Sequence, residues 1–228
     1  MYLDILRKLK YLVAGVCLAV VFSVRALGAG PPAEVEGVIK ADTAWSGTVL
    51  VAGDVLVPDG VTLTIAPGTT VEFVSSESSK IEPMFLSMQT ELLVRGVLRV
   101  PGTKDAPVRF IPAPEALNTK RPARGDWGGV IFDGESASAS VVSGAYFAMA
   151  DSAIATYNSS PTVAGCRIED CGYGLVCAGQ SRPRLSGCVI TGCGTGIVAS
   201  NGGRATVEDT TFEKNEHDTL GMADVKGK

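Results

Sequence analysis

Cysteines are the residues with the clearest chemical potential in this sequence. Five of the six lie near the C-terminal end of the chain: Cys166, Cys171, Cys177, Cys188 and Cys193. Four of them form two pairs with the same Cys-x4-Cys spacing. Four thiolates could hold a metal ion, two could form a disulfide, and a free thiol can also serve as a small buried apolar residue. Zinc sites usually hold such paired cysteines in turns and not at stacked positions of a repeat, so a metal site is the weakest of the three alternatives.

These cysteines belong to an internal repeat. The segments Ser160–Val176 and Arg182–Val198 align at a shift of 22 residues, which superposes Cys166 on Cys188 and Cys171 on Cys193. A degenerate copy follows downstream at the same shift, and an upstream copy fits a shift of 21. A fixed period this short is typical of stacked repeat architectures. One such repeat cannot bury its own apolar face, so it must stack on its neighbours.

The apolar residues of the repeat fall in short β-type segments separated by Gly, Pro, Asn or Ser, and no helical period is present. Stacking the copies in register predicts parallel strands about 4.8 Å apart. Ile168 and Ile190 should then be buried neighbours. The predicted interior ladders are Val142/Val163/Leu185/Val207, Phe147/Ile168/Ile190/Phe212 and Ile154/Leu175/Ile197.

The same stacking defines the alternatives for the cysteines. Cys166 should lie over Cys188 and Cys171 over Cys193, at a separation that disulfides accept. Buried thiols, stacked disulfides and, least favoured, a metal site all remain open. Cys177 has no repeat partner, because Ala199 occupies the equivalent position. We therefore predict that Cys177 is a free thiol.

Segments upstream of the repeat resemble a known family. Asp54–Phe73, Leu92–Thr103, Pro107–Phe110 and Trp127–Phe132 resemble the N-terminal coils of bacterial secreted, pectin-lyase-like β-helix proteins, and Ser160–Ser200 resembles their generic coil. The resemblance implies an all-β fold, a single-stranded right-handed parallel β-helix of about seven coils with a repeat of 21–22 residues. It implies no particular activity, because the family includes polysaccharide lyases and hydrolases, copper-site maturation proteins and adhesins.

No catalytic constellation is recognisable. Lyases and hydrolases of this fold need clustered carboxylates. The candidate acids are scattered along the chain and do not recur as a cluster on the repeat: Asp105, Asp126, Asp133, Asp151, Asp170 and Asp209. His217 is the sole histidine and lies in the degenerate last coil, where a solvated role is expected. We predict no catalytic residues, no metal ligands and no cofactor.

One cluster of basic residues could bind a ligand. Arg182 and Arg204 occupy the same repeat position, and Arg184 lies two residues from Arg182. Such a strip suits carboxylated or sulfated glycans. The alternative, which we favour, is that these charges only discourage association with other sheets.

The N-terminal segment predicts secretion. Basic residues in Met1–Lys10 precede an uncharged apolar run, and small residues follow near Gly28, as in a secretory signal peptide. Residues 1–28 are therefore expected to be removed, 29–43 to form a linker or N-terminal cap, 44–220 the β-helix domain and 221–228 a tail. The mature part would carry 16 basic and 23 acidic residues, a net charge of −7. This balance argues against nucleic acid as a partner.

Two insertions interrupt the predicted strands. Ser75–Thr90 contains the cluster Met84, Phe85, Leu86 and Met88, and Pro112–Gly125 is rich in proline and basic residues. Loops this long are functional or disordered. The first is expected to pack over the scaffold, with a partner-binding lip as the alternative.

Together these observations favour a secreted, non-catalytic β-helix that binds or supports something at the cell envelope or outside the cell. Polysaccharide or another envelope protein is the expected partner, without a membrane span after cleavage. The alternative is a carbohydrate-active enzyme with an unrecognised site. Whether the protein is periplasmic, on the cell surface or extracellular, and its oligomeric state, stay open.

Overall fold

The structure is a computed structural model that describes residues 33–76, 88–113, 124–221 and 224–226, the last three by their backbone alone. The chain divides into two units, Met1–Gly30 and Pro31–Lys228, and all described residues belong to the second. The predicted signal peptide and Met84, Phe85 and Leu86 lie outside the described residues. Met88 is exposed.

The described part is a parallel β-helix, so the predicted fold class is confirmed. The chain winds repeatedly through three faces, which we name first, second and third in the order in which each coil visits them. The strands of the first face are β2 (Thr43–Trp45), β4 (Thr62–Ile65), β7 (Val97–Pro101), β10 (Val141–Ser143), β13 (Thr162–Ala164), β16 (Arg184–Ser186), β19 (Thr206–Glu208) and β22 (Asp224–Lys226). A short 3₁₀ helix, η2 (Ser136–Ala139), precedes β10.

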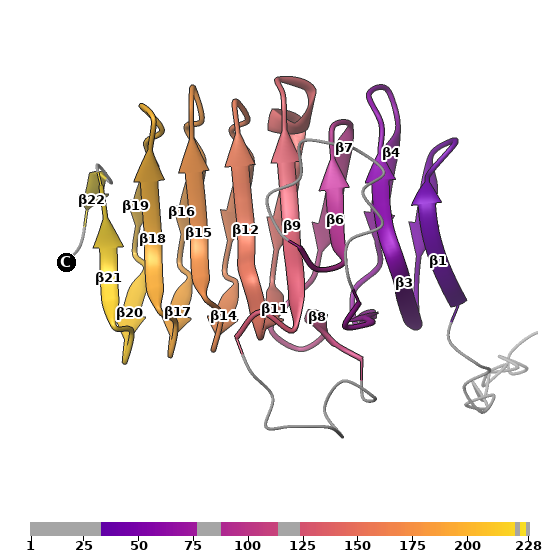
Figure 1. Cartoon of the computed structure of the whole chain (residues 1–228), viewed down its shortest axis with the longest axis horizontal. Helices are drawn as coiled ribbons and strands as arrows, with labels where there is room; N and C mark the ends of the chain where they lie inside the picture. The colour runs from indigo at the N-terminus through magenta and orange to yellow at the C-terminus, as the bar shows by residue number, and fades with distance from the viewer. Residues whose placement is uncertain (1–32, 77–87, 114–123, 222–223, 227–228) are drawn as a thin grey trace, which may run out of the picture. The chain divides into compact units, whose positions relative to one another are not determined.

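The other two faces are continuous through β3 (Thr48–Val57), whose two halves belong to different faces. The second face continues with β5 (Thr70–Phe73), β8 (Val108–Pro112), β11 (Ala145–Ala148), β14 (Arg167–Glu169), β17 (Val189–Thr191) and β20 (Thr211–Glu213). The third face continues with β6 (Glu91–Val94), β9 (Trp127–Asp133), β12 (Ala150–Tyr157), β15 (Tyr173–Ala178), β18 (Thr195–Ser200) and β21 (His217–Leu220). Figure 1 shows the third-face strands side by side in chain order.

The described strands complete seven coils, and β22 begins an eighth. At the other end β1 (Ala33–Val38) lies parallel to both halves of β3. The segment that we expected to be a linker or N-terminal cap therefore contains a strand that pairs with the first coil. Among the described residues no helix is long and apolar enough to cross a membrane.

Side chains pointing inward form ladders along the stack. Ile168 faces Ile190 on adjacent parallel strands, and both are fully buried. Phe110 stacks on Phe147 with ring centroids 4.7 Å apart, because the same interior position recurs one coil later. Burying such side chains stabilises the fold by about 1.5–3 kcal/mol each. Burial of these side chains, together with the backbone pairing of adjacent strands, therefore holds the coils together.

Close approach of adjacent coils explains two of the repeat's glycines, which lie in β15 and β18. A Cβ on Gly174 would lie 2.5 Å from the carbonyl oxygen of Gly196, and a Cβ on Gly196 would lie 2.5 Å from that of Asp218. Neither glycine has a positive φ, so the requirement is space and not backbone conformation. Their recurrence at a spacing of 22 follows from the stacking itself.

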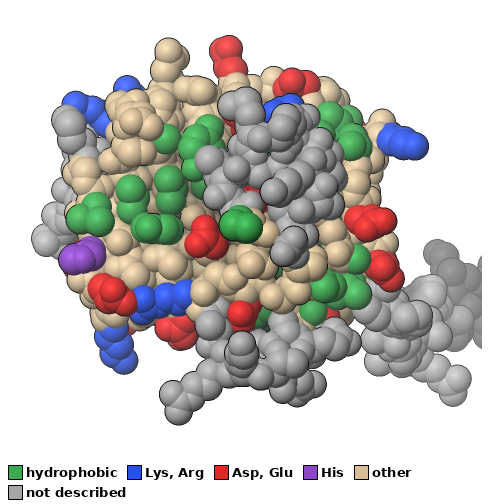
Figure 2. Space-filling model, viewed as in Figure 1, with side chains coloured by type: hydrophobic (Ala, Val, Ile, Leu, Met, Phe, Trp, Pro, Cys, Tyr) green, Lys and Arg blue, Asp and Glu red, His purple; other side chains and the backbone are tan. Residues whose placement is uncertain are grey.

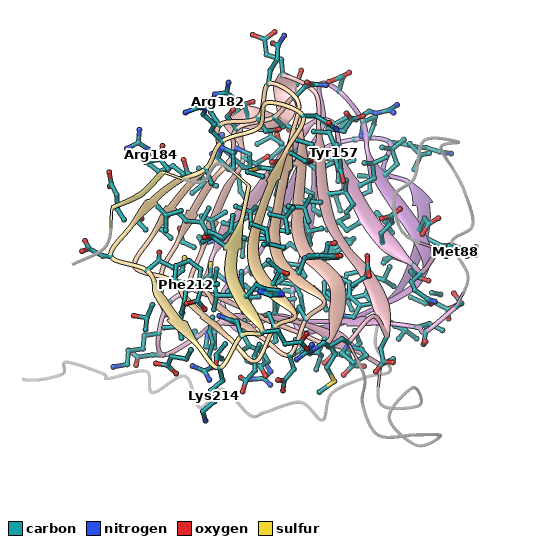
Figure 3. The ribbon with its side chains drawn as sticks, turned by 60° about the vertical axis from the view of Figure 1, so that its left-hand side comes forward. Met88, Tyr157, Arg182, Arg184, Phe212 and Lys214 are labelled. Atoms are coloured by element: carbon teal, nitrogen blue, oxygen red, sulfur yellow. The ribbon has the colours of Figure 1, made fainter. Side chains whose placement is uncertain are left out.

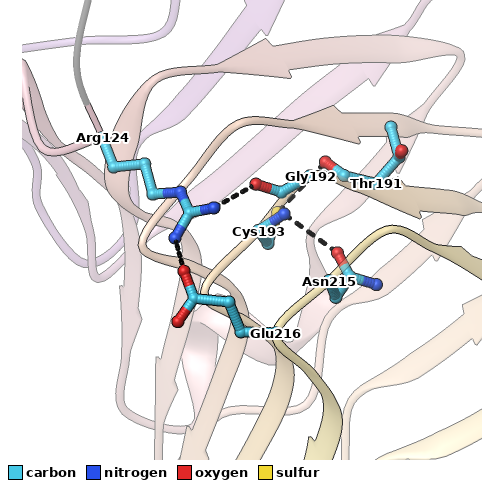
Figure 4. Close-up of polar contacts among 6 residues, drawn as sticks. All are labelled: Arg124, Thr191, Gly192, Cys193, Asn215 and Glu216. Atoms are coloured by element: carbon cyan, nitrogen blue, oxygen red, sulfur yellow. Dashed lines mark hydrogen bonds and ion pairs between the residues drawn. The ribbon is translucent and has the colours of Figure 1, made fainter.

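In the seventh coil, Asn215 and Glu216 replace the Cys-Gly of the repeat. Asn215 contacts the sixth coil, and Glu216 pairs with Arg124, which is also bound to the sixth coil (Figure 4). Asn215 accepts a hydrogen bond from the amide of Cys193 at 2.9 Å. Arg124, which follows the second insertion, donates to the carbonyl of Gly192 at 2.8 Å and pairs with Glu216. One guanidinium thus links the third coil to the sixth and seventh.

Candidate binding surfaces

A row of basic and aromatic side chains crosses the outside of the second face. Arg109 on β8 is in register with Tyr146 on β11, which is in register with Arg167 on β14. The Arg109 guanidinium lies 4.6 Å from the centroid of the Tyr146 ring, a cation–π contact. The row therefore presents two guanidinium groups about two strand spacings, or roughly 10 Å, apart.

The two arginines of this row differ in their electrostatic partners. Arg167 Nε lies 3.0 Å from Glu169 Oε2, and this hydrogen bond lowers the pKa of Glu169 and raises that of Arg167. Among the described residues no carboxylate is within ion-pair distance of Arg109. Burial, followed by the charge of Glu169, raises the pKa of Tyr146, so its hydroxyl stays protonated and can donate a hydrogen bond at neutral pH.

A groove of about 670 Å³ adjoins this row. Lys104 contributes a third cation, and Gly102, Gly144 and Gly165, which have no side chains, also line the groove. Gly102 cannot be enlarged, because a Cβ there would lie 2.4 Å from the carbonyl oxygen of Gly144. The groove is basic although the predicted mature chain is acidic.

The outside of the third face has a different character. An apolar row runs along all seven coils at one register position: Leu56, Leu93, Ile131, Ala155, Val176, Val198 and Leu220. Its first four members are buried, and exposure increases toward Leu220, which is 45% exposed. Figure 2, which views this face, shows hydrophobic side chains gathered over the C-terminal coils.

A second row on the third face carries carboxyl groups. Asp54 Oδ1 accepts a hydrogen bond from the Glu91 amide at 3.0 Å, and Glu91 is followed in the row by Gly129 and Ser152. The Glu91 side chain is 0% exposed, and neither carboxyl oxygen has a hydrogen-bond partner. Burial, then the nearby carboxyl groups of Asp54 and Asp151, raise the pKa of Glu91 to about 8. Glu91 is therefore neutral at pH 7.

A depression of about 250 Å³ lies on the third face next to this row. Asp151, Ser152, Tyr157 and Tyr173 line it together with apolar residues of β9, β12, β15 and β18. Burial raises the pKa of Asp151, and burial followed by the charges of Glu91 and Asp151 raises that of Tyr157. The depression thus combines a carboxylate, hydroxyl groups and aromatic rings.

The arginines singled out from the sequence lie elsewhere. Arg182 donates to the carbonyls of Ser181 and Gly202 at 2.7 and 2.9 Å, so its guanidinium is bound to a turn. Arg204 lies one coil further in the same turn position. Arg184 is exposed at the start of β16. Figure 3 shows it on the same side of the stack as Arg182, with Lys214 on the opposite side. None of the three lines either depression described above.

All five described cysteines are free and buried. The thiols of Cys166, Cys171, Cys188 and Cys193 donate to the carbonyl two residues earlier, at 3.3–3.6 Å. The neighbouring Cys188 thiol, together with burial, raises the pKa of Cys166, and the neighbouring Cys166 thiol lowers that of Cys188. Cys171 and Cys193 make the corresponding pair.

Cys177 occupies the interior of the third face, in register with Thr156 and Ala199. Burial raises its pKa to about 11, so the thiol stays protonated at neutral pH. A thiol that is 0% exposed will react slowly with alkylating reagents unless the fold opens. Among the described residues no group of three or more His, Cys, Asp or Glu side chains could hold a metal ion.

Of the six candidate aspartates, Asp151 alone joins the cluster around Glu91. His217 is exposed at the C-terminal end of the outward row of the third face that begins with Asp54 and Glu91, one strand beyond Thr195. Glu91 itself was not predicted from the sequence. The signal that could have found it is the uninterrupted apolar run Leu92–Val94, which indicates a strand buried on both sides and therefore a buried position for its glutamate.

The comparisons with known proteins agree with the fold. Residues 125–226 match a family model described as a right handed beta helix region. This places the regular coils in the class of right-handed β-helices. No curated protein and no solved structure matches the chain.

Proposed function

We propose that this chain is a secreted, non-catalytic β-helix that binds an acidic polysaccharide through the groove of the second face. The observation that carries the proposal is the register of Arg109, Tyr146 and Arg167 on three successive parallel strands beside Lys104. A polymer repeats its charges at regular intervals, and a β-helix repeats its side chains in the same way. Secretion is supported by the leader-like N-terminal sequence.

The chemistry of the groove fits carboxylated sugars. Guanidinium groups bind carboxylates through charge-assisted hydrogen bonds, and the Tyr146 ring offers a flat apolar surface to a sugar ring. Arg109 has no ion-pair partner among the described residues, so binding a ligand carboxylate breaks no existing ion pair of this side chain.

Polygalacturonate, with neutral dextran as comparison, tests this function. The double variant Arg109→Ala/Arg167→Ala should lower affinity for polygalacturonate by about tenfold or more, since two charge-assisted contacts are lost. The matched variant Arg99→Ala/Arg184→Ala removes two exposed charges from the first face and should change affinity less than about threefold. Isothermal titration calorimetry at low and moderate NaCl measures both, and salt should weaken the binding of the parent protein.

Equal losses in the two double variants would refute the second-face site and return attention to Arg184. Binding of dextran with the same affinity would refute the charge-based recognition. Release of new reducing ends from polygalacturonate by the parent protein would contradict the non-catalytic assignment.

A further inference from the structure

The third face has a feature that acidic-polysaccharide binding does not use: a buried carboxyl group without a hydrogen-bond partner. Burying a polar group without a partner costs roughly 1–3 kcal/mol. Glu91 is such a group, with both carboxyl oxygens unsatisfied. Such groups are uncommon in folded proteins, and each calls for an explanation such as a functional role or a bound partner.

Glu91 does not itself line the depression, but its carboxyl group interacts electrostatically with Asp151 and Tyr157, which do. Glu91 precedes the inward-pointing Leu92, so its side chain lies on the outer side of the third face. Between Glu91 on β6 and Asp151 and Ser152 on β12 lies β9, which has Gly128 and Gly129 at this position. No side chain of β9 therefore separates the Glu91 side chain from those of Asp151 and Ser152. Gly129 cannot gain one, because a Cβ there would lie 1.8 Å from the carbonyl oxygen of Ser152.

We propose that Glu91 and Asp151 form a second binding site, which takes the primary ammonium group of a ligand whose apolar part lies in the depression of the third face. An ammonium group has three donors and no acceptor, so it can satisfy the oxygens of both carboxyl groups at once. This site is independent of the polysaccharide groove, which lies on another face.

Two observations select an organic ammonium over other occupants. The described residues contain no cluster with metal-binding geometry, so the two carboxyl groups lack the further ligands that a divalent ion needs. The remainder of the depression is apolar and aromatic, with Tyr157 packed against the buried apolar cluster and Val176 and Val198 beside it. Tyrosine rings attract cations, and aliphatic side chains accommodate an alkyl chain.

Binding should depend on pH, because the ammonium ligand requires ionised carboxylates. The titratable groups that interact with Glu91 are Asp54 from β3 and, from β12, Asp151 and Tyr157, and each of them is neutral or negative. With a pKa of about 8, Glu91 is almost wholly protonated at pH 6 and mostly ionised at pH 9. An alkylammonium ion with a pKa above about 10 keeps its charge over this range. Affinity should therefore rise by one to two orders of magnitude from pH 6 to pH 9.

n-Pentylammonium is the probe, and 1-pentanol is its uncharged counterpart. Calorimetry of the full chain at pH 6, 7.5 and 9 should show binding of n-pentylammonium that strengthens with pH and is at least tenfold tighter than that of 1-pentanol at pH 9. Glu91→Gln keeps the shape of the side chain, removes its charge and should abolish the pH dependence. Asp151→Asn should weaken binding at every pH.

The control variant is Asp209→Asn, which removes an exposed acid from a turn in the seventh coil and should leave binding unchanged. Far-UV circular dichroism shows whether each variant is folded, and polygalacturonate binding reports separately on the second face. No binding of n-pentylammonium at pH 9, equal binding of 1-pentanol, or an unchanged pH profile in folded Glu91→Gln would each overturn the site.

Discussion

The outward rows of the second and third faces are built by the same parallel ladder, yet they treat charge in opposite ways. Arg109 and Arg167 are exposed and have an aromatic or acidic neighbour. Glu91 lies in an equivalent outward position but is fully buried and unsatisfied. The difference teaches that an outward register position does not ensure contact with water. The residues that cover or adjoin a strand decide whether an outward side chain there can carry a charge.

The largest expected effect concerns the difference between an inward and an outward position on the same strand. Ile190→Asp should unfold the protein or remove most of its stability, because an unpaired buried charge costs several kcal/mol of a total margin of about 5–15 kcal/mol. Val189→Asp places the same charge one residue earlier, in the outward row of Arg167. It should cost less than about 1 kcal/mol. Urea unfolding followed by circular dichroism measures both, and similar losses would show that the assigned inward and outward sides of β17 are wrong.

The second prediction concerns the pH dependence of stability. The pKa of Glu91 is raised to about 8 in the folded protein, so the folded state holds its proton more tightly than the unfolded state. The free energy of unfolding should therefore fall as pH rises from about 5 to 9, by up to about 5 kcal/mol. Glu91→Gln should remove this loss and be more stable than the parent at pH 9, as measured by urea unfolding.

Asp209→Asn serves as the matched control for that measurement, since the side chain is exposed. If the parent and Glu91→Gln lose the same free energy of unfolding between pH 5 and pH 9, Glu91 is not the buried acid that this structure describes.

The smallest expected effect concerns the basic row. Glu169→Gln removes the ion-pair partner of Arg167, so a ligand carboxylate no longer competes with it. Affinity for polygalacturonate should rise about threefold, in keeping with an exposed ion pair worth under about 1 kcal/mol. Glu208→Gln removes an acid from the first face and should have a smaller effect. A gain in Glu208→Gln as large as that in Glu169→Gln would indicate that net charge alone controls binding.

The fold followed from the sequence because the repeat determines the stacking. A shift of 22 residues places Ile168 opposite Ile190, and a shift of 21 places Tyr146 opposite Arg167, as the structure shows. The register of Arg109 with Tyr146 could not be predicted by such a shift, because the insertion Pro112–Gly125 lies between these two residues.

The third-face site could not be derived by such shifts. Glu91 and Asp151 are 60 residues apart, and β9 and β12 pair with a register irregularity between Ser152 and Ile154. The position of Asp151 relative to Glu91 therefore depends on a local deviation of the backbone that no periodic alignment contains. The stacking of the paired cysteines, in contrast, follows from the repeat. Whether they are free thiols or disulfides does not follow from it.

The contacts of Arg124 have a consequence for how the stack opens. In a repeat protein each unit contacts only its neighbours, so terminal units fray independently of the middle. Arg124 binds Gly192 and Glu216, respectively 68 and 92 residues further along the chain. Opening of the last coil must therefore break a contact that is anchored three or more coils away. Amide hydrogen exchange in β20 and β21 is thereby coupled to the middle of the molecule, and the C-terminal coils join a larger cooperative folding unit.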